Sequence, residues 1–476
     1  MATKHHKTSL KDVFSNCQVL SLDPNPSFFK LLSHYFDIND FIPLDFFNAF
    51  YHSKGRHRLY PLKGFLSAFI IQKIFSIPTD SLLLTFLNFS KEFRDFCGFS
   101  KVPDASLLSR FKHQFQPFIQ LMFQHLVDLT EPICQNIDSS LADTIVFDTS
   151  GIELFVSENN PKFLNSLTRK LKSFYKNNSD VDPYKMAYSI MPSHAASCSY
   201  AKQMYINGHF CYADKFAILT NGLGIVRHIS FIDDDDFKAS HPELVINQKS
   251  DSPDTDKYVG DSNCLVPVLN DFFAFHHNFH PKTFLGDASF DSFDLYKSLL
   301  HDFKFSKALI PYNPRNESPL KKVGYNSYGY PTCPNDSSLA MKYCGITKEK
   351  GRSDRFKWIC PKMRYHKGWI CDCENPCSTA KKGRTTYTHK NMDLRIFPGI
   401  QRDSDEWKNT YKIRTIVERT INHFKSNMCI AERKTRNHTT TKSDVFLAGI
   451  ASQVIVLVAN AIGCPEYIKS IKPLIV

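Results

Sequence analysis

Hydrophobic residues first recur in a regular pattern near Leu62, at the three- and four-residue spacing of one helix face. Thr79 and Asp104 are positioned to begin further helices, and Asp104 is an N-cap candidate. Four helices are therefore expected, at residues 62–74, 82–93, 105–115 and 117–129. Together they predict an all-helical domain over residues 51–140, after an N-terminal segment of residues 1–50.

Basic side chains gather near the third of these helices: Lys101, Arg110, Lys112 and His113. A helical bundle with such a face is typical of DNA-binding domains of the helix-turn-helix type. A plain helical domain explains the same pattern equally well, so both interpretations stay open.

The pattern changes at Thr144, where a short β-branched strand ends at Asp148. Residues 209–220 and 224–232 alternate as a hairpin around Asn221-Gly222. A strand at 283–286 ends at Asp287, a helix is expected over 291–300, and a strand over 305–310. Strands that alternate with helices predict an α/β domain.

Residues 312–400 interrupt this α/β pattern and are rich in Pro, Gly, Asn and Cys. Helical periodicity returns near Asp405 and continues to about Asn427. The α/β core is thus expected to comprise residues 141–311 and 401–464, split by an insertion and followed by a tail over residues 465–476. The apolar run at 445–464 contains polar residues and is expected to be a buried helix rather than a membrane span.

The formal net charge is +12, and it is concentrated in one stretch. Between Lys342 and Arg436 there are 23 Lys plus Arg against 10 Asp plus Glu. A basic surface of this size favours a polyanionic partner such as nucleic acid. The 14 Cys, with no secretory signal before them, argue against a disulfide framework.

One helix carries an unusual set of polar side chains. At 100° per residue, Tyr411, Arg414, Glu418 and Lys425 fall within a narrow arc of the helix surface. Two strands end in carboxylates, and this helix would add Glu418 to the same sheet edge. Three converging carboxylates repel one another unless divalent cations neutralise them. Hard oxygen ligands suit two Mg²⁺ or Mn²⁺ ions of the kind that promote phosphoryl transfer.

The spacing Tyr411-x2-Arg414-x3-Glu418-x6-Lys425 resembles the YREK signature of bacterial insertion-sequence DDE transposases. Residues 285–292, Leu-Gly-Asp-Ala-Ser-Phe-Asp-Ser, are similar to the second-Asp segment of that family, and residues 145–150 to its first. The helical region is similar to the domain that precedes such catalytic cores. The resemblance extends over roughly residues 50–460.

The resemblance implies an α/β RNase H-like catalytic core that binds the metal ions through Asp148, Asp287 and Glu418. It implies hydrolysis at transposon ends and then attack of the freed 3′-hydroxyl on target DNA. Tyr411 and the two cations of the signature, Arg414 and Lys425, would position DNA phosphates. Double-stranded DNA is the expected partner, the protein is expected to act as a homodimer on DNA, and its expected location is the cytoplasm, associated with the nucleoid.

Three other acidic residues and one run of aspartates are not expected to bind metal. Asp143 precedes its strand, Asp291 is expected to cap a helix or face solvent, and residues 233–236 are expected to form a solvated turn. Glu153 is likewise not expected to be a metal ligand.

The insertion holds six cysteines, at Cys333, Cys344, Cys360, Cys371, Cys373 and Cys377. No Cys-x2-Cys pair is present, so a structural zinc site stays one interpretation and a β-containing module with reduced cysteines the other. Two further functions also stay open beside the transposase. One is a different RNase H-like nuclease, and the other is a non-catalytic DNA-binding regulator derived from a transposase.

Overall fold

The computed structural model describes residues 28–51, 57–176, 181–206, 209–244, 259–313, 324–326, 330–365, 368–389, 394–395, 397–402, 404–432 and 434–474. The chain divides into two compact units, residues 1–279 with 415–476 and residues 280–414. The first unit contains the N-terminal helices, an antiparallel sheet and the C-terminal helices. The second begins earlier than the insertion expected at 312–400, because it also includes two strands from before that segment.

Local signals in the sequence account for the N-terminal helices. Thr79 and Asp104 cap their helices, each accepting a hydrogen bond from the backbone three residues on. The helix expected over 82–93 is instead two, because Ser90 ends the first and its side chain caps the second. The helical elements of this region are α2 (Phe28–Tyr35), η1 (Ile38–Phe41), α3 (Leu44–Phe50), α4 (Leu62–Ile74), α5 (Asp80–Phe89), α6 (Lys91–Cys97), α7 (Ala105–Gln114), α8 (Gln116–Ile137) and α9 (Ser139–Ala142).

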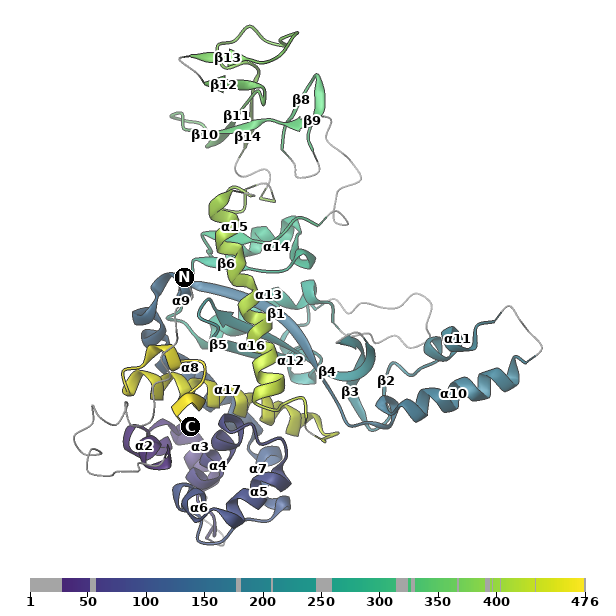
Figure 1. Cartoon of the computed structure of the whole chain (residues 1–476), viewed down its shortest axis with the longest axis vertical. Helices are drawn as coiled ribbons and strands as arrows, with labels where there is room; N and C mark the ends of the chain where they lie inside the picture. The colour runs from purple at the N-terminus through teal and green to yellow at the C-terminus, as the bar shows by residue number, and fades with distance from the viewer. Residues whose placement is uncertain are drawn as a thin grey trace. The chain divides into compact units, whose positions relative to one another are not determined.

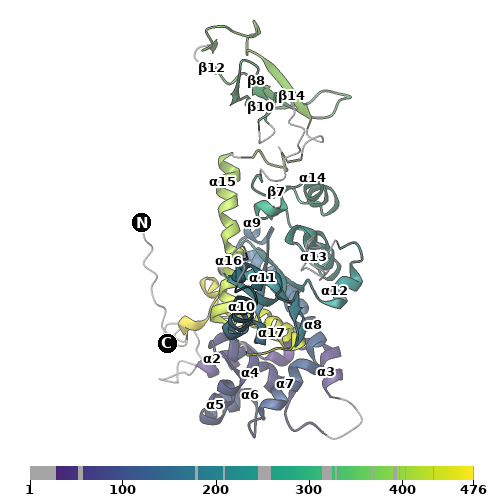
Figure 2. The ribbon, with the colours of Figure 1, turned by 90° about the vertical axis from the view of Figure 1, so that its right-hand side faces the viewer.

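The long apolar helix near the C-terminus, α17 (His438–Ala461), packs against α4, α7 and α8 in the helical region (Figure 2). Among the described residues it is the one helix long and apolar enough to cross a membrane, and 83% of its most apolar window is buried. A core helix has the same composition, and the burial agrees with the expected buried helix. Two short turns follow it, η8 (Pro465–Tyr467) and η9 (Lys472–Leu474).

The sheet of the first unit is built around one long strand, β4, which pairs with β1 along one edge (Figure 1). Its other edge pairs first with β3 and then with β5, and all these pairs are antiparallel. The β4–β5 turn begins at Asn221-Gly222, as the hairpin pattern predicted. The strands are β1 (Thr144–Glu153), β2 (His194–Ala195), β3 (Cys198–Ile206), β4 (His209–Asn221) and β5 (Val226–Phe231).

Helices flank and extend this sheet. One of them, α16, lies against β1 and β4 (Figure 1). The remaining helical elements of the first unit are η2 (Ser157–Asn159), α10 (Pro161–Phe174), α11 (Pro183–Ser189), α12 (Asp235–Ser240), α13 (Asp261–Phe275), α16 (Thr415–Asn422) and the π-turn η7 (His423–Asn427).

The second unit combines a parallel strand pair with small antiparallel sheets. Strands β6 and β7 are parallel, whereas β10, β11 and β14 form a three-stranded sheet, and β8–β9 and β12–β13 form two hairpins. Phe356 and Trp358 of β11 pack with Met341 in a small aromatic core. The elements are β6 (Thr283–Leu285), η3 (Ala288–Phe290), α14 (Phe293–Lys297), the π-turn η4 (Ser298–Asp302), β7 (Lys307–Leu309), β8 (Thr332–Cys333), β9 (Asp336–Ala340), β10 (Lys342–Thr347), β11 (Arg355–Ile359), β12 (Met363–Tyr365), β13 (Trp369–Cys371), β14 (Thr385–His389), α15 (Asp405–Tyr411) and η6 (Lys412–Arg414).

The helix expected over 405–427 is not uniform. α15 is followed by the 3₁₀ turn η6, then by α16 and the π-turn η7. A 3₁₀ helix turns by about 120° per residue and a π-turn spaces its hydrogen bonds further apart. The constant 100° used for the signature residues therefore does not apply between Tyr411 and Lys425.

Candidate active site

Asp148 lies in the middle of β1, where the burial of the strand changes. Residues 144–147 are buried, whereas residues 148–150 are half-buried. Its Oδ1 accepts a hydrogen bond from the backbone N–H of Thr149 at 2.8 Å. The buried half of the strand thus anchors the carboxylate, which remains accessible.

Glu418 is held over the same sheet by the packing of α16. Thr420 of this helix donates a hydrogen bond to the backbone oxygen of Gly224 at 3.0 Å. A Cβ at Gly224, whose φ is +82°, would lie 2.8 Å from Cγ1 of Ile416. The close approach therefore requires glycine at this position. Val417 is buried and Glu418 is exposed, so the helix packs through its apolar side and leaves the carboxylate accessible.

Lys425 follows in the π-turn η7 and interacts electrostatically with β1. Burial lowers the pKa of its ammonium group, while the nearby carboxylate of Asp148 opposes that shift. Both signature residues of this segment, Glu418 and Lys425, thus belong to the same unit as Asp148.

Lys425 lines a hollow of about 350 Å³ together with Thr149, the residue that follows Asp148. At its wall, Lys215 is buried and its Nζ lies 2.6 Å from Oδ1 of Asp261. The hydroxyl of Thr149 donates to the same oxygen at 2.7 Å. The hollow is lined by Thr149, Ser150, Gly151, Met204, Tyr205, Ile206, Lys215, Asp261 and Lys425.

Sequence reasoning missed Lys215 and Asp261. The available signal was the charged pair Asp214-Lys215 inside a segment expected to be a strand, because a buried ammonium needs a partner.

Asp287 lies in the second unit, two residues after the end of β6. Its Oδ1 accepts a hydrogen bond from Ser289 N at 2.6 Å, and its carboxylate lies 3.6 Å from the Arg414 guanidinium. The hydroxyl of Tyr411 donates to the backbone oxygen of Gly286 at 3.3 Å. The structure therefore brings three predicted site residues together here: Asp287, Tyr411 and Arg414. The Tyr411 ring also stacks on the buried Trp407, with ring centroids 4.8 Å apart, so Trp407 has a packing role.

Asp291 was expected to cap a helix or to face solvent; it lies at the C-terminal end of η3 but does not face solvent. It is fully buried and paired with two arginines, Arg395 at 2.5 Å and Arg402 at 3.5 Å. Tyr296 donates to it at 3.1 Å, and the backbone N–H of Asn313 at 2.8 Å. The carboxylate joins separate segments of the second unit, a structural role that leaves it outside the candidate metal set.

The acidic run at 233–236 is only in part the solvated turn that was expected. Asp235 and Asp236 are exposed, but Asp233 and Asp234 are buried. Asp233 pairs with Lys202 at 3.2 Å, and Asp234 pairs with Lys442 and His438. These contacts tie β3 and the start of α17 to the loop after β5.

The predicted basic face of the helical domain also needs correction at one residue. Lys112 is fully buried, and its Nζ lies 2.9 Å from both Asp80 and Asp444. Lys73 reaches the same Asp444 at 3.5 Å. Lys112 therefore stabilises the packing of α5, α7 and α17 and is not available to DNA.

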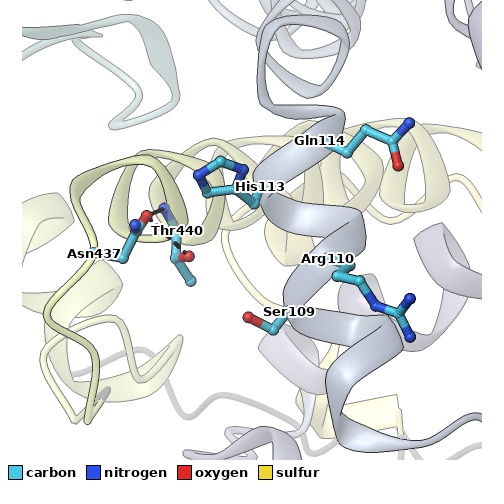
Figure 3. Close-up of a pocket in the computed structure, with 6 residues that line it drawn as sticks. All are labelled: Ser109, Arg110, His113, Gln114, Asn437 and Thr440. Carbon is cyan, nitrogen blue, oxygen red and sulfur yellow. Dashed lines mark hydrogen bonds between the residues drawn. The ribbon is translucent and has the colours of Figure 1, made fainter.

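The exposed side of α7 borders a hollow of about 330 Å³ with the start of α17 (Figure 3). Ser109 and His113 point toward Asn437 and Thr440, whereas Arg110 points away from them. Asn437 caps α17 by accepting a hydrogen bond from Thr440 N at 2.9 Å.

The six cysteines of the insertion are distributed over several of its strands and loops. Cys333 lies in β8, Cys344 in β10, and Cys360 follows β11. Among the residues whose side chains the structure describes, no three metal-binding groups of this segment lie within 4.8 Å of one another. The side chain of Cys371 lies outside that description, so the zinc interpretation stays a prediction.

Comparison with known proteins adds one match. Residues 18–114 match the family described as Transposase domain (DUF772). The match includes α2 to α7 and ends at the last residue of α7. Neither the curated proteins nor the solved structures gave a match. The helical region therefore supports a transposase-related function for the chain.

Proposed function

We propose that this chain is the DDE transposase of an insertion sequence, which cleaves transposon ends and joins the freed 3′-hydroxyl to target DNA. The observation that carries the proposal is the match of residues 18–114 to a transposase domain, in a chain that also contains the YREK spacing. The mixed α/β architecture of the rest of the chain is compatible with an RNase H-like core.

Three carboxylates would hold the metal ions in this proposal: Asp148, Asp287 and Glu418. Asp148 and Asp287 are half-buried and Glu418 is exposed, so each is supported by its backbone while its oxygens remain accessible. Carboxylate oxygens are the ligands preferred by Mg²⁺ and Mn²⁺. When bound, two such ions lower the pKa of the attacking hydroxyl or water and neutralise charge on the leaving oxygen.

The basic residues would bind the DNA backbone. Lys425 borders the hollow beside Asp148, where its ammonium can pair with a phosphate. Arg414 pairs with Asp287 in the free protein, and its guanidinium offers further donors for a bidentate phosphate contact. Tyr411, through its hydrogen bond to Gly286, would act by holding the backbone that carries Asp287.

The remaining partners follow from the reaction. The substrate is double-stranded DNA, and the protein would act as a homodimer because transposition brings two ends together. The exposed side of α7, with Arg110 and His113, is a candidate surface for binding the ends. Nucleoid association in the cytoplasm is the location that this role requires.

The test is cleavage of a labelled duplex that carries the terminal inverted repeats flanking the gene, with and without Mg²⁺. Asp148→Asn, Asp287→Asn and Glu418→Gln should each lower the rate of strand cleavage by more than about a hundredfold. Mutation of a residue that only hydrogen-bonds to a metal ligand already lowers metal affinity or activity by about 10- to 100-fold, and loss of a ligand itself should cost more. Matched controls are Asp294→Asn and Glu432→Gln, both exposed carboxylates outside the proposed metal set.

Cleavage at the wild-type rate by any of the three carboxylate variants would show that the site is assigned incorrectly. Specific binding to the repeats without Mg²⁺-dependent cleavage by the folded wild-type protein would instead favour the non-catalytic regulator.

A further inference from the structure

Three side chains that commonly bind transition metals meet at one end of the β1–β4 pair. They are Glu153, His209 and Cys211, and their ligand atoms all lie within 4.8 Å of one another. Nε2 of His209 is 3.3 Å from Oε2 of Glu153.

The register of the strands explains why these residues meet. His209, Cys211 and Ala213 alternate along β4, and therefore project from one face of the sheet. Glu153 of β1 pairs directly with Ala213, which places its side chain on that same face. Cys211 is the diagonal neighbour of Glu153 and lies within its reach. His209 is one same-face position further along β4, and the long side chains of Glu153 and His209 span that distance. The arrangement therefore follows from regular strand pairing.

The donor set differs in chemistry from the three carboxylates of the candidate active site. A thiolate, an imidazole and one carboxylate are ligands that suit Zn²⁺, whereas Mg²⁺ prefers oxygen alone. For tetrahedral zinc, bond lengths of about 2.0–2.3 Å place neighbouring ligand atoms roughly 3.3–3.6 Å apart. The His209–Glu153 separation already has this value, and Sγ of Cys211 lies within 4.8 Å of both other ligand atoms.

We propose that Glu153, His209 and Cys211 form a binding site for a zinc-type divalent cation, with its fourth position open to water. Cys211 is buried, whereas His209 and Glu153 are exposed. The ion would therefore enter from the solvent side, where the imidazole and the carboxylate lie, and would bind the thiolate on its protein side. Such an ion would link the end of β1, the strand that carries Asp148, to β4. Glu153, not expected to bind metal from its sequence context, thereby becomes a ligand.

The test uses the full-length protein freed of metal with a chelator and then loaded with Co²⁺, which replaces Zn²⁺ and gives a thiolate-to-cobalt absorption band. The insertion cysteines could contribute the same band, so the readout is the difference between wild type and variant. Cys211→Ser should lose about one equivalent of thiolate-bound Co²⁺ per chain, and His209→Gln should weaken its binding at least about tenfold. The matched control is Cys198→Ser, which changes another buried cysteine of the same sheet.

Glu153→Gln is a second variant that is not expected to unfold the protein, because Glu153 is exposed. It keeps the thiol, so it should lower the affinity for Co²⁺ without removing the thiolate-to-cobalt absorption band. Identical Co²⁺ spectra and affinities for wild type, Cys211→Ser and Glu153→Gln would overturn the proposal. DNA cleavage is not part of this readout, and the inference does not rest on the proposed transposase activity. Either proposal can therefore fail without the other.

Discussion

His438, the first residue of α17, is held between two buried carboxylates. Its Nδ1 lies 2.6 Å from Asp214 and its Nε2 lies 3.2 Å from Asp234, while its ring stacks on Tyr200. Burial alone would lower the pKa of the imidazole. The hydrogen bonds and negative charges of the two aspartates outweigh burial and raise the pKa of His438 from 6.5 to about 9. The protonated ring therefore joins α17 to β4 and to the loop after β5.

The shift sets both the size and the direction of a pH effect on folding. A rise from 6.5 to about 9 corresponds to roughly 3 kcal/mol, at about 1.4 kcal/mol per pKa unit. This is an upper value, because burial raises the pKa of Asp214. Part of the favourable interaction between His438 and Asp214 therefore only offsets the cost of keeping that buried carboxylate ionised. The pKa is higher in the folded state, so the stabilisation is fully present below about pH 6.5 and is lost as the pH rises through about 9.

The assay compares urea unfolding at about pH 6 and pH 9.5, together with hydrogen exchange of the β4 amides, for wild type and His438→Gln. Wild type should lose up to about 3 kcal/mol more stability over this range than the variant, since glutamine does not titrate. His125→Gln, a change at an exposed helical histidine, is the control and should behave as wild type. Equal losses for wild type and His438→Gln would refute the reasoning.

Two further substitutions test the packing that supports the candidate sites. Lys112→Met should lower the free energy of unfolding by about 3–5 kcal/mol, because it leaves the buried carboxylate of Asp444 without its closest partner. The control, Lys91→Met, breaks an exposed ion pair and should lower the free energy of unfolding by less than about 0.5 kcal/mol. Denaturant titration measures both values. Gly224 and Gly98 both have positive φ, but only a Cβ at position 224 would clash with α16. Gly224→Ala should therefore destabilise the protein by about 1–3 kcal/mol more than Gly98→Ala, and it should also lower the rate of DNA cleavage. Equal effects of the two glycine substitutions on unfolding and cleavage would contradict the proposed role of that close contact.

Much of the secondary structure could be predicted because its signals are local. α4 has the bounds expected from its apolar periodicity, and Asp104 caps α7 as predicted. The β4–β5 hairpin was recognisable from two alternating segments around Asn221-Gly222. The error at Ser90 has a local cause as well, because apolar spacing continues through a turn in which a serine side chain replaces a helical hydrogen bond.

The candidate site was predictable only in part. Sequence spacing alone selected the signature residues, and the structure joins Asp287 with Arg414 and Tyr411 in one unit and Asp148 with Lys425 in the other. The cluster of Glu153 with His209 and Cys211 was not predictable, because it depends on the register of two strands that are separated by residues 154–208.

The helices, the main hairpin and the order of the candidate catalytic residues could thus be recognised without the fold, since caps and periodicity depend on neighbours a few residues apart. The tertiary structure alone decided which charges are buried. Lys112, Asp234 and Asp291 looked like surface residues in sequence, yet each is buried against a partner at least 20 residues away, such as Asp80, Lys442 or Asn313. Burial of a charge requires such a partner, and only the folded chain brings it within reach.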